Sequence, residues 1–187
     1  MDFIKFAAPA HPALDSFRDA INNEAIIGKV PPCALAAIVM RETGGRNIFQ
    51  IGMPKGDGCG VGLTQITAGV DWANPDDPRY QGYRLLDPQQ NLYVAAAYFL
   101  SPAIKDCLQL REQHGQTMAR FSNEILYFAF AAYNAGFGAV QSAIENGEDP
   151  DSHTTDTYGA GTLAFYQQFV TSSHATFGVP VGAGASG

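Results

Sequence analysis

Charged residues and cysteines are both scarce in this chain of 187 residues. Asp, Glu, Lys and Arg make up 16% of it, and the formal net charge is −7 with no Lys/Arg cluster. An acidic protein without a basic patch repels nucleic acid and anionic lipid, so we expect neither as a partner. The three cysteines leave at least one unpaired, and no spacing of cysteine or histidine suits zinc. We therefore expect no metal and no cofactor.

Long apolar runs are missing as well. The first residues, Met1 to Phe6, show no basic region followed by an apolar stretch, so the sequence predicts neither a secretory signal nor a membrane span. Hydrophobic residues still make up 46% of the chain, which is enough for one substantial core at this length. We expect a single domain over residues 1–177. Residues 178–187 are small, Gly-rich and without periodicity, and are predicted to form a flexible tail.

Apolar residues recur at helical spacing along most of the chain. This pattern predicts an amphipathic helix over residues 12–27 and a buried helix over residues 33–43. Further helices are predicted over residues 88–100, 103–112, 123–135, 139–146 and 157–170. Residues 46–87 are rich in Gly, Pro, Asn and Asp, so we expect a functional loop with short strands near residues 62–66. The predicted fold class is mainly α.

Glu42 lies near the end of the predicted helix 33–43, on one face with the apolar residues three, four and seven positions earlier. Burial against that face and the negative end of the helix dipole both disfavour the ionised form and raise the pKa of its carboxyl. A carboxylic acid that is still protonated near neutral pH can protonate the leaving oxygen of a glycosidic bond. The alternative is a structural carboxylate paired with Arg41 or Arg46.

Four motifs occur in a set order, and the first of them contains Glu42. They are Arg41-Glu42-Thr-Gly-Gly, Gly60-Val-Gly62-Leu63-Thr64-Gln65-Ile66, Asp87-Pro-Gln-Gln-Asn91 with Tyr98-Phe-Leu100, and Ala131-Ala-Tyr133-Asn134-Ala-Gly136. Together they resemble the lytic transglycosylase and goose-type lysozyme superfamily, in which a Glu at a helix end precedes a Gly-Leu-Met-Gln-Ile turn and an Ala-Tyr-Asn-Ala-Gly helix. The resemblance implies a lysozyme-like helical domain with a Gly-rich loop or short hairpin in its cleft. It also implies a muramidase that cleaves the β-1,4 bond between N-acetylmuramic acid and N-acetylglucosamine, with Glu42 as catalytic acid.

The goose-type branch looks nearer, because Ala139-Val140-Gln-Ser142 and Thr154-Thr-Asp-Thr-Tyr158 are also similar. In that branch a Gly-Asp element carries an active-site Asp, and Gly56-Asp57-Gly58 matches it. The branch's other Asp directly follows the Gly-Leu turn, where this chain has Thr67. For a second catalytic carboxylate the resemblance thus implies Asp57, with Asp71 as the next candidate.

The resemblance also suggests which residues bind the glycan. They are Gly62, Leu63, Gln65, Tyr133, Asn134 and Tyr158. Glycine lets the backbone approach a sugar ring closely, and the amide and hydroxyl groups offer hydrogen bonds, with the Tyr133 hydroxyl directed to Glu42 or to substrate. Each residue also has an ordinary structural explanation, as part of a Gly-rich hairpin or as a core tyrosine.

Two reactions remain open for the proposed acid. In hydrolysis with inversion, a second carboxylate roughly 6.5–9.5 Å from the acid activates a water molecule. In lytic transglycosylation the ionised Glu42 takes the proton of the sugar's own 6-hydroxyl and leaves a 1,6-anhydro end. The presence of Asp57 favours hydrolysis, that is, a lysozyme, and Thr67 weakens that preference. The alternative from a different class is a non-catalytic glycan-binding or virion structural module.

The expected partner is a peptidoglycan glycan strand, bound in a groove because the net charge gives no general attraction to an anionic wall. We expect a monomer that acts on the cell wall, in the extracellular or periplasmic space. With no visible export signal, a phage endolysin, a virion-associated enzyme, a transferred effector and a trimmed secreted protein are all compatible with the sequence.

Overall fold

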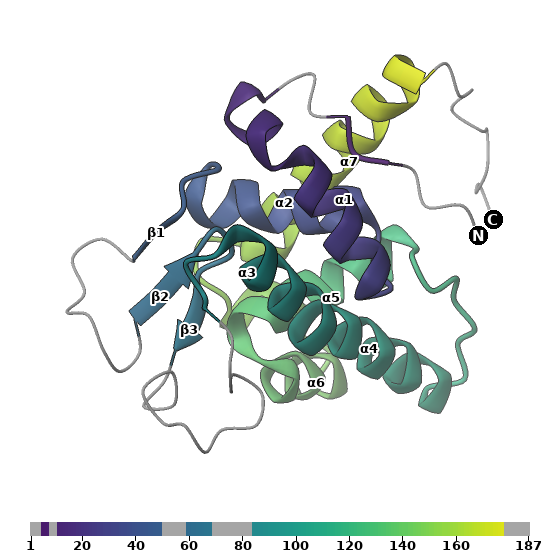
Figure 1. Ribbon diagram of the computed structural model, residues 1–187. Coiled ribbons are helices and arrows are strands. Elements are labelled where there is room, and N and C mark those ends of the chain that lie inside the picture. Colours follow the sequence, from purple (N-terminus) through teal and green to yellow (C-terminus); the bar gives the residue numbers. More distant parts are fainter. Residues whose placement is uncertain (1–4, 8–10, 50–58, 69–83, 178–187) are drawn as a thin grey trace.

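The computed structural model describes residues 5–7, 11–49, 59–68 and 84–177. Helices make up most of this part of the chain, which confirms the predicted mainly α fold class (Figure 1). The α-helices are α1 (Arg18–Ile27), α2 (Pro32–Thr43), α3 (Pro88–Val94), α4 (Ser101–Gln113), α5 (Asn123–Ala135), α6 (Phe137–Glu145) and α7 (Tyr158–Phe177). Short 3-10 helices cover Pro12–Phe17 and Pro150–His153. The division into one domain over residues 1–177 and a tail stays a prediction, and the tail lies outside the described residues.

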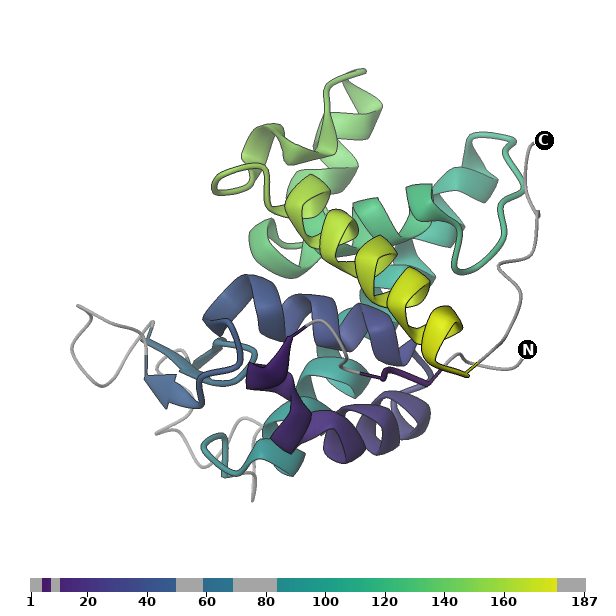
Figure 2. The same ribbon diagram turned by 90° about the horizontal axis from the view of Figure 1, so that it is seen from above.

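Helix α7 packs against both α2 and α5, and these three helices hold much of the core (Figure 2). Helix α5 has the bounds that the apolar pattern predicts; it begins after the Ser122 side chain, which accepts a hydrogen bond from the Ile125 amide at 3.3 Å. The side chains of Leu35, Phe130 and Phe169 are fully buried there. Burying each contributes about 1.5–3 kcal/mol. This packing fixes the end of α2 relative to the start of α7.

Three helix predictions need correction. The predicted break between residues 100 and 103 is absent, because the π-helix Ala95–Leu100 joins α3 to α4 without interruption. The wider π turn lies directly before Pro102, whose ring and missing N–H disturb regular α-helical hydrogen bonding. The predicted helix over residues 12–27 opens with a 3-10 helix, and α7 continues seven residues beyond its predicted end.

His11, directly before the first 3-10 helix, is half-buried. Its ring packs edge-on against Phe165 and Phe169, with centroid distances of 6.3 and 5.1 Å. Nearby, the backbone of Phe6 exchanges hydrogen bonds of 2.8 and 3.0 Å with the buried Asn22 amide. The chain before α1 is therefore packed against α1 and α7, which the sequence pattern did not predict.

A three-stranded antiparallel sheet forms one edge of the molecule beside α2 and α3 (Figure 1). Its strands are β1 (Ile48–Phe49), β2 (Cys59–Gly62) and β3 (Ile66–Ala68). The predicted short hairpin is confirmed, but the turn between β2 and β3 covers residues 63–65, where we expected strand.

The buried Asn91 of α3 holds this hairpin in place. Its Oδ1 accepts hydrogen bonds from the amide and the hydroxyl of Thr64, at 3.0 and 2.8 Å, and its Nδ2 donates to the Val61 carbonyl at 2.9 Å. From the other side, the Thr43 hydroxyl at the end of α2 donates to the Leu63 carbonyl at 2.9 Å. The hairpin is thus fixed against both helices, directly beside Glu42.

Cys33 and Cys107 are buried free thiols. Burial raises the pKa of Cys33 to about 11 and that of Cys107 to about 12. Among the described helices, none is long and apolar enough to cross a membrane.

Candidate active site

Helix α2 places Glu42 in its last turn. Pro32 occupies the first turn, where its missing N–H is not needed, and the residues up to Val39 are buried. The helix ends at Gly44, which adopts the left-handed conformation at φ +61° and donates its N–H to the Met40 carbonyl at 3.1 Å. The sequence predicted this buried helix over residues 33–43. As a result Glu42 is half-buried at the point where α2 meets the sheet.

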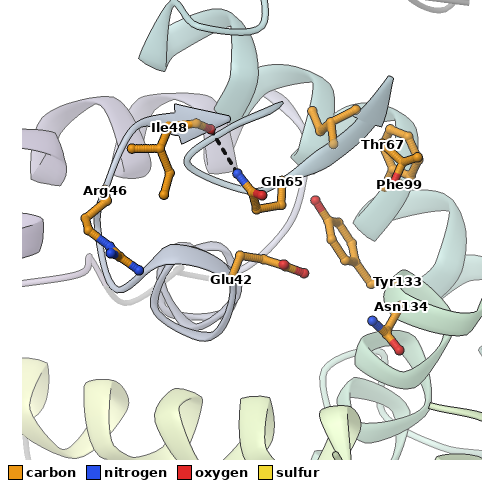
Figure 3. A pocket seen from close by; sticks show the side chains of 9 residues that line it. Glu42, Arg46, Ile48, Gln65, Thr67, Phe99, Tyr133 and Asn134 are labelled. Atoms are coloured by element: carbon orange, nitrogen blue, oxygen red, sulfur yellow. Dashed lines mark hydrogen bonds between the residues drawn. The ribbon is translucent and has the colours of Figure 1, made fainter. Parts of the chain in front are cut away.

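Glu42 lines a pocket of about 380 Å³, within the range of small-ligand sites. The described residues that line it come from the end of α2 and the segment after it, from the sheet and its turn, from the π-helix and from the end of α5. They are Glu42, Arg46, Ile48, Gln65, Ile66, Thr67, Phe99, Tyr133 and Asn134. The Glu42 carboxyl lies between Arg46 and Ile48 on one side and Tyr133 and Asn134 on the other (Figure 3).

The environment of Glu42 raises the pKa of its carboxyl. Burial is the largest cause, and it outweighs the hydrogen bond from Tyr158 and the positive charge of Arg41, which both lower the pKa. The Tyr158 hydroxyl donates to Glu42 Oε1 at 2.5 Å, so a proton on this carboxyl belongs on Oε2. A carboxylic acid held in this way can act as a general acid.

The alternative of a Glu42 that is merely paired with an arginine is not what the structure shows. No ion pair joins Glu42 to Arg41 or Arg46 among the residues described. Arg41 Nη2 donates instead to the Asp156 carbonyl at 2.8 Å, and Arg46 Nε donates to the Thr43 carbonyl at 2.9 Å. The two arginines therefore fix neighbouring backbone segments.

Tyr158 begins α7 and is held firmly against Glu42. Its side chain is 3% exposed, and the Arg41 guanidinium lies 5.4 Å from the centre of its ring. The residue before it, Thr157, is left-handed at φ +50°, an uncommon backbone state for residues with a side chain. The Asp151 carboxylate accepts hydrogen bonds from the amides of Gly159 and Ala160, at 2.7 and 2.8 Å, and so caps the start of α7. These contacts determine where the hydroxyl points.

For a reaction in which Glu42 acts as the general acid, Tyr158→Phe is expected to move the pH profile to higher pH. The hydrogen bond from Tyr158 lowers the pKa of Glu42, so its loss raises that pKa further. A general acid must be protonated, and the alkaline decline in kcat/KM reports its pKa in the free enzyme. That decline should therefore shift upward, while the rate on the plateau changes by about tenfold or less, the effect of one hydrogen bond.

Tyr166→Phe is the matched control, because Tyr166 lies on the same helix about two turns further along and does not line the pocket. Its pH profile should coincide with that of the wild type. A decline that moves to lower pH in Tyr158→Phe, or does not move, would contradict the role given to the hydroxyl.

Three of the predicted binding residues line the pocket. Tyr133 donates its hydroxyl to the Thr64 carbonyl at 3.0 Å, and not to Glu42, and its ring stacks on that of Tyr158. Gln65 Nε2 donates to the carbonyls of Ile48 and Gly62, at 3.0 and 2.9 Å. Asn134 Oδ1 accepts from the Thr155 amide at 3.1 Å. All three side chains are thus oriented by backbone groups.

The other three predicted binding residues stand behind the pocket wall. Leu63 is fully buried in the core, and Gly62 faces Asn91 and Leu85. Tyr158 contacts two lining residues, Glu42 through its hydroxyl and Tyr133 through its ring. Their contact with a glycan stays a prediction. In the structure they pack behind the residues that line the pocket.

The predicted second carboxylates, Asp57 and Asp71, lie outside the described residues. Thr67, at the position where goose-type enzymes carry their other Asp, is exposed and lines the pocket. Sequence reasoning missed Phe99 as a lining residue, although it stands inside the Tyr98-Phe-Leu100 motif. Within the described ranges no group of three His, Cys, Asp or Glu side chains could hold a metal ion.

Comparison with known protein families gives a match. A family model described as the transglycosylase SLT domain matches residues 19–155, which is well over half of the chain and includes all four motifs. No curated protein matches the sequence.

Proposed function

Because this chain belongs to the transglycosylase SLT domain family, we propose that it cleaves the β-1,4 bond between N-acetylmuramic acid and N-acetylglucosamine, with Glu42 as general acid. The match confirms the resemblance to the lysozyme-like superfamily and makes the chain a peptidoglycan-acting enzyme of the cell wall. The nearer likeness to the goose-type branch stays a prediction. The observation that carries the proposal is the half-buried Glu42 carboxyl in the pocket, with its raised pKa and one oxygen held by Tyr158.

The reaction that we propose is lytic transglycosylation. Glu42 Oε2–H protonates the oxygen that links C1 of the muramic acid to C4 of the next sugar, and the C1–O bond breaks. The carboxylate then takes the proton of the 6-hydroxyl of the muramic acid while O6 bonds to C1. The products are a 1,6-anhydro end and a free 4-hydroxyl, and Glu42 is protonated again.

Two observations support this reaction over hydrolysis. The family that matches is described by transglycosylase activity. Among the described residues that line the pocket, Glu42 is the only carboxylate, and Thr67 stands where the resemblance implies a second. Hydrolysis is the second candidate, and it rests on Asp57 in the Gly-Asp element. The sequence alone favoured hydrolysis, and we now place transglycosylation first because of the description of the matching family and of Thr67.

The mass of the soluble products from purified peptidoglycan tests this proposal. Anhydro ends are expected, and they are lighter than ordinary reducing ends by one water. Asp57→Asn is expected to change the rate by less than about tenfold, against the roughly 10²–10⁴-fold loss for removing a general base.

Reducing ends together with a large loss in Asp57→Asn would establish hydrolysis by a lysozyme. A large loss with anhydro products would give Asp57 an orienting role and leave the transglycosylase reaction in place. No soluble product from the wild type would favour the non-catalytic glycan-binding module.

A further inference from the structure

Arg46 is the only cationic side chain among the described residues that line the pocket. It lies beside Ile48, on the far side of Glu42 from Tyr133 and Asn134 (Figure 3). The rest of the described lining is apolar or neutral apart from Glu42, and burial favours the neutral form of that carboxyl. This end of the pocket is thus positively charged in a protein whose net charge is −7.

The guanidinium of Arg46 is oriented by a backbone carbonyl, and within the described ranges no carboxylate neutralises it. Its Nε donates to the Thr43 carbonyl at the end of α2, at 2.9 Å. No carboxylate of the described residues forms an ion pair with it. With Nε engaged, the N–H groups of the two Nη atoms remain for another partner, and this planar pair suits the two oxygens of a carboxylate.

The proposed substrate, a peptidoglycan strand, carries carboxylates in one part of its repeating unit. The sugar rings and their N-acetyl groups are neutral, so the negative charge of a strand lies on the lactyl arm at C3 of the muramic acid. That arm ends either in its own carboxylate or in a stem peptide with carboxylates. Glu42 acts at C1 of the same ring, so the arm leaves the ring close to the pocket.

We propose that Arg46 binds a carboxylate of the lactyl arm and so selects strands by their negative charge, an inference that rests on the proposed function. The hydrogen bond from Arg46 Nε to the Thr43 carbonyl holds the guanidinium at a set position, as a binding residue requires. A charge-assisted pair of hydrogen bonds contributes about 1.5–3 kcal/mol, or roughly 10–100-fold in binding.

The test compares Arg46→Gln with the wild type on three kinds of strand. The first carries stem peptides with free carboxylates, the second has been stripped by an amidase to free lactyl carboxylates, and the third carries stem peptides whose carboxylates have been converted to amides. For Arg46→Gln we expect KM to rise about 10–100-fold on one or both of the charged strands, with kcat little changed. On the neutral strand KM should equal that of the wild type.

Two further variants separate the effect of the planar guanidinium from the effect of the overall charge of the protein. Arg46→Lys keeps the charge without the planar pair and should recover only part of the affinity. Arg18→Gln changes the net charge equally at an exposed site outside the pocket, and should leave KM unchanged on all strands.

If KM of Arg46→Gln rises only on stripped strands, the ligand is the lactyl carboxylate. If it rises only on peptide-bearing strands, the ligand is a carboxylate of the stem peptide. Equal losses on charged and neutral strands, or an unchanged KM throughout, would overturn the inference while the cleavage activity stands. If the wild type cleaves none of the strands, the proposed function is wrong and this inference is wrong with it.

Discussion

Glu42→Gln is expected to lower the rate of glycan cleavage by about 10²–10⁴-fold or more while the fold is retained. The amide keeps the shape of the carboxyl group, and its oxygen can still accept the hydrogen bond that Tyr158 donates to Oε1. It cannot release a proton to the glycosidic oxygen, nor take one from the 6-hydroxyl afterwards. The measurement is the rate at which soluble products appear from purified peptidoglycan.

Glu24→Gln is the matched control for this variant. Glu24 is also a partly buried helical glutamate with a raised pKa, caused by burial and by the charge of Asp87, but it lies on α1 and does not line the pocket. Its replacement should leave the rate unchanged. Near-wild-type turnover in Glu42→Gln, or an equal loss in Glu24→Gln, would show that the wrong carboxylate has been assigned.

Glu42→Gln also has a predictable effect on the stability of the fold. Burial raises the folded-state pKa of Glu42 above its unfolded value, so this group favours the folded state most at pH below its ordinary pKa. That contribution is lost as the pH rises through the raised pKa. Glu42→Gln lacks this loss, so its Tm relative to the wild type should increase from acidic to neutral pH. A lower relative Tm at neutral pH would mean that the ionised carboxylate has a stabilising partner.

The mainly α fold and the half-buried position of Glu42 were predictable from the sequence because they depend on local patterns. The bounds of α5, the stop of α2 at Gly44 and the apolar face shared by Glu42 all follow from helical spacing and from glycine conformation. The raised pKa of Glu42 follows from the same face, since burial is its main cause.

The partners of these residues were not predictable, because they come from distant parts of the chain. The Tyr133 hydroxyl was expected to point to Glu42 or to substrate. The packing of α7 against α2 instead makes Tyr158, 116 residues from Glu42, the hydrogen-bond donor. Leu63 stands in a motif expected to bind the glycan, yet the burial of the hairpin against α2 and α3 places it in the core. Spacing along the chain says which face a residue occupies, but not what covers that face.

Gly62→Ala is expected to cause the largest loss of stability among the substitutions considered, because two separate costs add. Gly62 has φ +79°, which is unfavourable for a residue with a side chain by about 1–2 kcal/mol. A Cβ there would also lie 2.3 Å from Asn91 Nδ2 and 2.4 Å from the Leu85 carbonyl oxygen. Overpacking of this kind costs about 1–3 kcal/mol. If Asn91 moves away, the buried Thr64 groups lose their partner at a further cost of about 1–3 kcal/mol.

Gly44→Ala separates these costs. Gly44 has a similar φ of +61°, but a Cβ there meets no atom within 4 Å, so backbone strain alone remains. We expect a loss of about 1–2 kcal/mol for Gly44→Ala and about 3 kcal/mol or more for Gly62→Ala. In thermal unfolding these correspond to decreases in Tm of roughly 2–8 °C and 6–12 °C or more. The rate of cleavage should also fall in Gly62→Ala, because the side chains of Gln65 and Tyr133 donate hydrogen bonds to the carbonyls of Gly62 and Thr64, which must shift. Equal losses in the two variants would mean that backbone strain alone requires glycine at position 62 and that Asn91 does not fix the hairpin.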